Sequence, residues 1–174
     1  RSHPLRQARI RALKGQIAAY AGKKTPTPAS LKYWHARMQA KFKGFNGNPS
    51  YILRKLNPAD KSEPAVMTRA IAYHRQGKLR KAMQQMAILL NKRPNDAYYR
   101  ELEGQILLVG DNPTGAVVAY KKAVALAPKE PLILAGYGRA LLSLKTKNGD
   151  KLALKPLRRA RQMDPRDARM LRDL

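Results

Sequence analysis

Three histidines and 11 carboxylate residues are the groups in this chain suited to acid–base or metal chemistry. Such chemistry needs several of these side chains to converge on one point, whereas His3, His35 and His74 lie in three different segments. The motifs HExxH, GxxxxGK[ST] and GxSxG do not occur, and the absence of cysteine excludes disulfides and thiol chemistry. The sequence therefore predicts no catalytic residue, no metal ligand and no cofactor within this chain.

The net charge of +25 arises from 36 basic and 11 acidic residues. A surplus of this size attracts an acidic protein, an anionic membrane surface or nucleic acid. With one Trp and two Phe, the chain offers few rings for base stacking, so nucleic acid is the less favoured partner. Solvated basic helix faces without a specific partner are the other interpretation of the charge.

No run of 18 apolar residues is present, so the sequence predicts no membrane span. The first residues lack the apolar centre of a signal peptide. Because the sequence does not begin with Met, we expect it to be part of a longer protein.

Two prolines 34 residues apart, Pro94 and Pro128, each follow an apolar helical pattern. A proline in this place ends one helix before the next begins. If three extra residues are allowed in the polar turn 145–150, Pro165 ends a third unit of the same kind. The period predicts units 63–96, 97–130 and 131–167, with a truncated fourth unit from residue 168.

Four columns of these units agree in residue size. Positions are counted from the first residue of each unit, without the three extra residues of the third unit. Small residues at positions 8 and 20 allow the two helices of a unit to cross closely. Larger or apolar residues at positions 24 and 27 fill the space toward the next unit. In unit order, the residues are Ala70, Gly104 and Gly138 at position 8; Ala82, Ala116 and Ala153 at position 20; Met86, Tyr120 and Leu157 at position 24; and Leu89, Ala123 and Ala160 at position 27.

This pattern resembles the tetratricopeptide repeat (TPR) family, whose period is also 34 residues. Arg100 departs from it, because position 4 is often Trp in the family. The resemblance implies an all-α fold, a TPR-type α-solenoid of helix-turn-helix repeats with N-terminal capping helices. It covers the array 63–174, and we interpret residues 1–62 as a helical linker and a degenerate capping hairpin.

The N-terminal third contains further helical patterns. We expect a helix over residues 4–21, a Pro- and Lys-rich linker over 22–30, an amphipathic helix over 31–45 and a short helix ending before Pro58. Leu31, Trp34, Met38 and Phe42 (or Phe45) form the apolar stripe of the third segment. We expect Trp34 in the core and His35 on the surface.

A narrower resemblance rests on SHPLRQARI, residues 2–10, followed by MQAKFKGFNGNP, residues 38–49. These segments are similar to the tail of bacterial HExxH zinc metallopeptidases of the β-barrel assembly-enhancing type. The resemblance implies a periplasmic or membrane-associated parent protease, with zinc only in a separate catalytic domain. His3 would then begin a helix or contact that domain.

The TPR resemblance also implies a concave partner-binding groove lined by positions 2, 5, 9 and 12 of each unit. The candidate groove residues are Met67, Ile71, His74, Arg75, Tyr98, Glu101, Gln105, Leu108 and Arg139. Pro64, Leu132, Ala135 and Leu142 occupy the remaining groove-facing positions, and Arg75 and Val109, at position 13, lie at the edge of the groove. For Met67, Ile71 and Leu108, internal packing is an equal alternative, whereas Tyr98, Gln105 and Arg139 are favoured for ligand contact. Because Met67 and Ile71 replace Lys and Asn, a clamp for C-terminal carboxylates is not supported.

The function expected from these features is a non-catalytic module that binds a protein or peptide in the groove. The alternative is a basic helical scaffold for an anionic membrane surface or nucleic acid. A third possibility combines the two: Lys155, Arg158, Arg159 and Arg161 contact lipid headgroups while the groove binds a protein.

Overall fold

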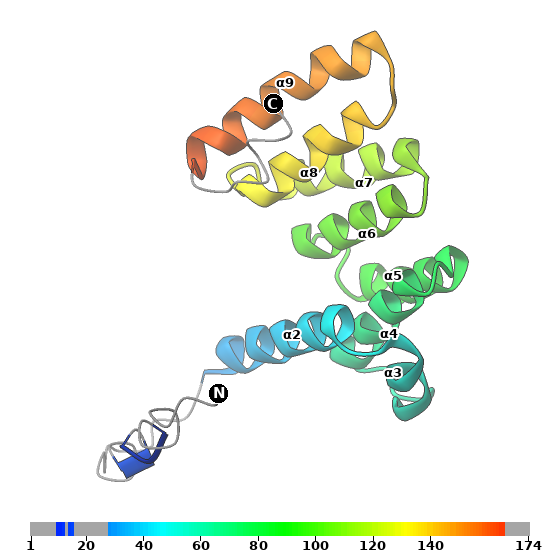
Figure 1. The fold of residues 1–174 in the computed structure, drawn as a ribbon, viewed down its shortest axis with the longest axis vertical. Helices are drawn as coiled ribbons and strands as arrows, with labels where there is room; N and C mark the ends of the chain where they lie inside the picture. The colour runs from blue at the N-terminus through cyan, green and yellow to red at the C-terminus, as the bar shows by residue number, and fades with distance from the viewer. Residues whose placement is uncertain (1–9, 13, 16–27, 166–174) are drawn as a thin grey trace, which may run out of the picture. The chain divides into compact units, whose positions relative to one another are not determined.

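The computed structural model describes residues 10–12, 14–15 and 28–165, which form helices and no strand (Figure 1). The all-α fold class is therefore confirmed for this part of the chain. The helices are α2 (Ala29–Asn46), α3 (Pro49–Lys55), α4 (Glu63–Arg75), α5 (Leu79–Lys92), α6 (Ala97–Val109), α7 (Pro113–Leu126), α8 (Pro131–Leu142) and α9 (Lys147–Met163).

Some expectations fall on residues that are not described. The helix predicted for 4–21 is described only at 10–12 and 14–15, which are helical. His3, most of the linker 22–30 and the fourth unit from residue 168 lie outside the described residues. Because α2 already begins at Ala29, the last two residues of the expected linker are helical.

The chain divides into two compact units, residues 1–33 and residues 34–174. The second unit contains α2 from Trp34 onward, α3 and the predicted array, so this division precedes the boundary expected after residue 62. The packing described below concerns this second unit.

Each predicted repeat unit contains two helices that pack against each other: α4 with α5, α6 with α7, and α8 with α9 (Figure 1). Local sequence sets their ends. The side chains of Asp96, Asn112 and Thr146 accept hydrogen bonds from backbone N–H groups in the first turns of α6, α7 and α9. The helices α5 and α7 both end just before the prolines that define the period, Pro94 and Pro128.

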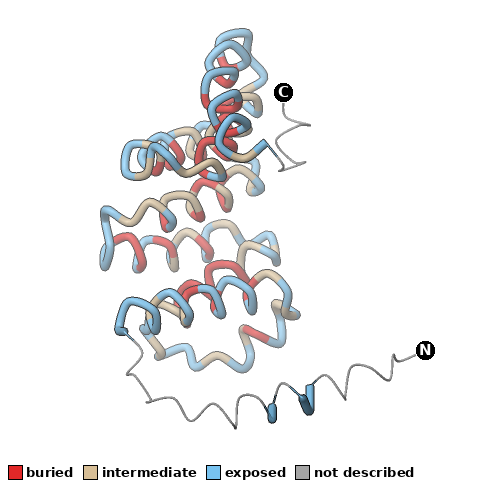
Figure 2. The backbone as a smooth tube through the Cα atoms, turned by 90° about the vertical axis from the view of Figure 1, so that its left-hand side faces the viewer, coloured by how far each residue is buried: buried red, intermediate tan, exposed pale blue. Residues whose placement is uncertain are grey.

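All residues of the four size-matched columns are buried, which confirms their predicted packing role. Buried residues gather where paired helices face each other, while the outer turns are exposed (Figure 2). The glycine column shows why bulk is excluded. A Cβ atom at Gly104 would lie 2.6 Å from Cδ2 of Tyr120, and one at Gly138 would lie 2.6 Å from Cδ2 of Leu157.

Helix α2 packs through a face of small residues rather than through its apolar stripe. Ala40 and Gly44 are buried, and a Cβ atom at Gly44 would lie 2.9 Å from Cβ of Ile71 on α4. The stripe is exposed instead, at Leu31, Met38, Phe42 and Trp34. The expectation of a core position for Trp34 is therefore wrong, since its side chain is 43% exposed.

Arg69, on α4, binds the segment that connects α3 and α4 and also contacts α5. Its buried guanidinium donates hydrogen bonds to the backbone oxygens of Asn57 (3.1 Å) and Asp60 (2.6 Å) and to Oε1 of Gln85 (3.0 Å). All three nitrogens of the guanidinium therefore donate a hydrogen bond, as a buried cation requires.

Candidate functional site

A cavity of about 410 Å³ lies between α2, α6 and α8, and we call it the main groove. It is lined by Lys41, Phe45, Glu101, Gln105, Leu108, Val109, Tyr120, Leu132 and Arg139. Val109 and Leu132 are 68% and 52% exposed, so apolar surface is open to solvent at the groove. Four residues expected in a groove from the TPR resemblance, namely Glu101, Gln105, Leu108 and Arg139, meet here.

A smaller hollow of about 130 Å³ adjoins the main groove, since Lys41 lines both. We call it the side pocket. Its other residues are Trp34, Arg37, Met38, Met67, Tyr98 and Leu102. Most of these side chains are apolar or aromatic, and two of the predicted groove residues, Met67 and Tyr98, are among them. This composition suits an apolar side chain of a ligand.

Three charged residues line the main groove, namely Lys41, Glu101 and Arg139. Lys41 Nζ lies 3.2 Å from Oε2 of Glu101, so these two charges offset each other. Arg139, on α8, contributes a further cation to the lining. Burial raises the pKa of the Tyr120 hydroxyl, with a smaller contribution from the Glu101 carboxylate, so the phenol stays neutral at physiological pH.

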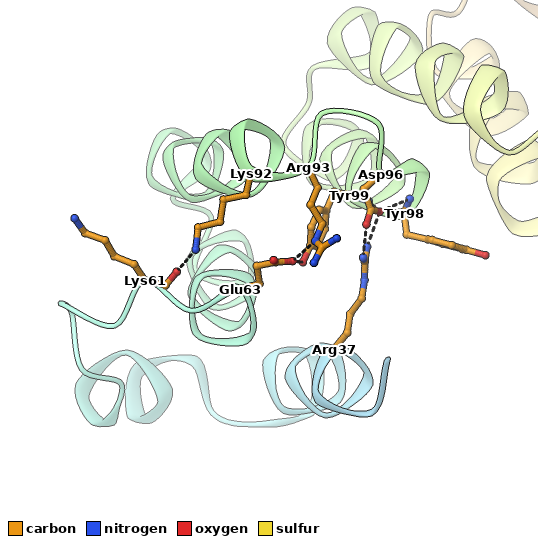
Figure 3. Close-up of polar contacts among 8 residues, drawn as sticks. All are labelled: Arg37, Lys61, Glu63, Lys92, Arg93, Asp96, Tyr98 and Tyr99. Atoms are coloured by element: carbon orange, nitrogen blue, oxygen red, sulfur yellow. Dashed lines mark hydrogen bonds and ion pairs between the residues drawn. The ribbon is translucent and has the colours of Figure 1, made fainter. Parts of the chain in front are cut away.

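An ion pair between distant segments positions α2 beside α6 (Figure 3). The Arg37 guanidinium donates two hydrogen bonds to the Asp96 carboxylate, at 2.5 and 2.9 Å. It also lies 3.8 Å from the ring centroid of Tyr99 and 5.3 Å from that of Trp34. Bidentate pairing and aromatic stacking are geometries for which arginine is suited and lysine is not.

The ion pair with Arg37 also affects the pKa of Asp96. Burial alone would raise the pKa of this carboxyl group, but hydrogen bonds from Arg37 and from the backbone N–H of Tyr99 hold the pKa below its ordinary value. The carboxylate therefore has two roles, since it caps α6 and pairs with α2.

A second polar cluster joins α4, the end of α5 and α6 (Figure 3). The Glu63 carboxylate accepts hydrogen bonds from Nε of Arg93 and from the hydroxyl of Tyr99, both at 2.8 Å. Nearby, Nζ of Lys92 donates to the backbone oxygen of Lys61 at 2.7 Å. The hydrogen bond to Glu63 holds in place the ring of Tyr99, against which Arg37 stacks.

Three predicted site residues line neither hollow. Ile71 is fully buried beneath Gly44, so it takes the internal packing role that the sequence left open. Arg75 donates to the backbone oxygens of Gly44 and Gly47 and thereby binds the end of α2. His74 is half-buried, and both burial and the Arg75 charge lower its pKa.

The other residues expected at the groove also differ in where they lie. Ala135 is buried, Leu142 is half-buried, and Pro64 lines a different hollow between α2 and α4. His35 is exposed, as expected. Met67 is buried to 1% exposure, so it forms part of the side pocket's wall rather than an open surface.

The contribution of α2 to the site was not predicted from the sequence. Lys41, Phe45, Trp34 and Met38 all come from this helix. A signal for its orientation exists in the sequence, because Arg37, Ala40 and Gly44 recur at helical spacing and are its buried residues. The more apolar stripe predicts a different buried face of the helix.

No protein-family model matches the sequence, and no curated protein matches it. In the described part of the chain, no helix combines the length and apolarity needed to cross a bilayer. Within the same residues, no three His, Asp or Glu side chains are grouped so as to hold a metal ion.

Proposed function

We propose that this chain is a protein-interaction module that binds a peptide segment in the main groove. The observation that carries the proposal is the convergence of Glu101, Gln105, Leu108 and Arg139 on one cavity with exposed Leu132 beside them. Apolar surface surrounded by polar groups with directional hydrogen bonds is typical of binding sites.

The chemistry of the side pocket and the net charge favour a particular ligand. The side pocket accepts an apolar side chain. The net charge of +25 adds long-range attraction for an acidic segment and speeds its association. The proposed ligand is therefore a peptide with an apolar anchor residue and a neighbouring acidic residue.

The finer proposal is that the helix pairs form a TPR-type solenoid belonging to a zinc metallopeptidase. Burial of the small-residue columns supports the solenoid, and the segments at residues 2–10 and 38–49 support the parentage by resemblance alone. In that setting the catalytic zinc belongs to another domain, and this chain recruits envelope proteins to a periplasmic or membrane-associated protease.

Peptide selection tests the proposal directly, because it requires no named partner. Random peptides displayed on phage are selected on the immobilised protein, and their affinities are then measured for Tyr98→Ala/Leu132→Ala/Arg139→Ala. We expect selected peptides to contain an apolar and an acidic residue and to bind this variant at least about tenfold more weakly, because aromatic and arginine anchors carry most interface energy.

The matched control is Val118→Ala/Lys121→Ala/Lys122→Ala, whose exposed residues lie on α7 outside both hollows. It should bind the peptides as the wild type does. Thermal melting checks that both variants remain folded. Equal affinities of the groove variant and the wild type would overturn the proposal.

A further inference from the structure

Helix α9, the second helix of the pair α8–α9, is more basic than α5 and α7, the second helices of the other two pairs. It carries six basic residues and one acidic residue, whereas α5 carries three basic residues and α7 carries two. The six are Lys147, Lys151, Lys155, Arg158, Arg159 and Arg161. All six are exposed, and none forms an ion pair with another described residue.

The basic residues lie on the side of α9 that faces away from the molecule. Gly149, Ala153, Pro156, Leu157 and Ala160 form its buried side, and α8 is the helix against which α9 packs among the described elements (Figure 1). Lys147, Lys151, Lys155 and Arg158 recur every three or four residues, so they form one stripe. At 1.5 Å per residue, the stripe is roughly 16 Å long.

Apolar side chains border this stripe. Leu152 is 52% exposed, Leu154 is 42% exposed and Met163 is 40% exposed. A hollow of about 570 Å³ is lined by Leu154, Arg158, Arg161, Gln162 and Pro165, which places two guanidinium groups beside an exposed leucine. Guanidinium groups bind phosphate oxygens in a bidentate geometry, and leucine is suited to the boundary between headgroups and acyl chains.

We propose that the outer face of α9 binds an anionic lipid bilayer through its headgroup phosphates. The stripe supplies the electrostatic attraction, and Leu152 and Leu154 supply shallow apolar contact. Nucleic acid fits this face less well, because α9 contains no aromatic residue on which a base could stack. The surface lies on a different helix from the main groove, so peptide and bilayer can bind together.

Vesicle sedimentation tests this inference. The protein is mixed at about 150 mM salt with vesicles of phosphatidylcholine alone or with roughly one third phosphatidylglycerol. We expect binding to the anionic vesicles only. Lys151→Gln/Lys155→Gln/Arg158→Gln should weaken the partition coefficient roughly a hundredfold, since each basic residue near the surface contributes about fivefold.

The control Lys121→Gln/Lys122→Gln/Lys129→Gln removes the same charge from positions on and after α7. It should retain most of the binding. Leu152→Ser/Leu154→Ser should weaken binding several-fold without changing the charge. Circular dichroism melting confirms folding of each variant.

Three results would overturn the inference. One is equal loss of vesicle binding in the α9 triple variant and its α7 control, which would indicate a diffuse charge effect. Another is equal binding to neutral and anionic vesicles. The third is retention of a DNA or RNA oligonucleotide at the same salt concentration without any binding to vesicles.

Discussion

Tyr120 lies between two glycines that belong to different helices. Gly104 is on α6, and Gly136 is on α8, where a Cβ atom would lie 2.6 Å from Cζ of Tyr120 and 2.8 Å from its hydroxyl oxygen. The ring therefore fills the space between one helix pair and the next, and it also lines the main groove. One buried residue thus sets the separation of the two helices that carry most of the candidate site.

Replacing Gly136 with alanine should destabilise the protein. The added methyl group collides with Tyr120, and overpacking costs about 1 to 3 kcal/mol. Alanine recovers about 1 kcal/mol of that through its helix propensity, so we expect a net loss of up to roughly 2 kcal/mol in the free energy of unfolding. Urea denaturation measures this quantity.

Measuring Gly136→Ala in the variant Tyr120→Leu as well identifies the cause of the lost stability. In Tyr120→Leu, the smaller side chain leaves room for the methyl group, so Gly136→Ala should cost less there than in the wild type. The same cost in both backgrounds would show that Tyr120 is not the residue that excludes a side chain at position 136.

The period of the sequence predicts Gly104 and Tyr120 as packing residues, because both occupy size-matched columns. Gly136 belongs to no such column, so its role follows only from the way α8 approaches α7. A repeat pattern identifies positions that recur, whereas a single close approach depends on the particular geometry of one pair of units.

At the scale of elements, the placement of α2 decides the shape of the site. The side chains of this helix form one wall of the main groove and most of the side pocket. Its extent was predictable, since the pattern at 31–45 corresponds to α2. Its orientation was not, because the Arg37–Asp96 pair joins residues 59 positions apart and an exposed apolar stripe contradicts the usual rule for amphipathic helices.

The Arg37–Asp96 pair should make the stability of this packing dependent on pH. The folded pKa of Asp96 lies below its unfolded value, so the stabilisation is complete above the unfolded value of about 4 and is lost as the pH falls through the folded pKa. We expect the free energy of unfolding to decrease on acidification through this range.

Asp96→Asn should flatten that dependence, because asparagine still caps a helix but carries no charge to pair with Arg37. At neutral pH we expect the substitution to lower the free energy of unfolding by about 1.5 to 3 kcal/mol, which is typical of a hydrogen bond to a charged group. Chemical denaturation of both proteins from neutral pH down to about pH 3 measures the effect, and the two stability curves should converge below about pH 4. Parallel curves for the two proteins would mean that Asp96 contributes nothing to the pH dependence.

At the scale of the molecule, the unit 34–174 combines two surfaces of different chemistry. The main groove joins apolar area with a few charged groups, and α9 presents a basic stripe. The sequence singled out Lys155, Arg158, Arg159 and Arg161 as basic, but the structure adds that Lys147 and Lys151 lie on the same exposed side of α9. The helix pairs were predictable because each repeats the same steric pattern.

The most direct test of the groove is photocrosslinking with a selected peptide. A benzoylphenylalanine is placed at Leu132, in the main groove, or at Val118, on α7 outside both hollows; the two residues are equally exposed at 52%. We predict that the peptide crosslinks at position 132 and not at position 118. Equal crosslinking at both positions, or crosslinking at 118 alone, would contradict binding in the groove.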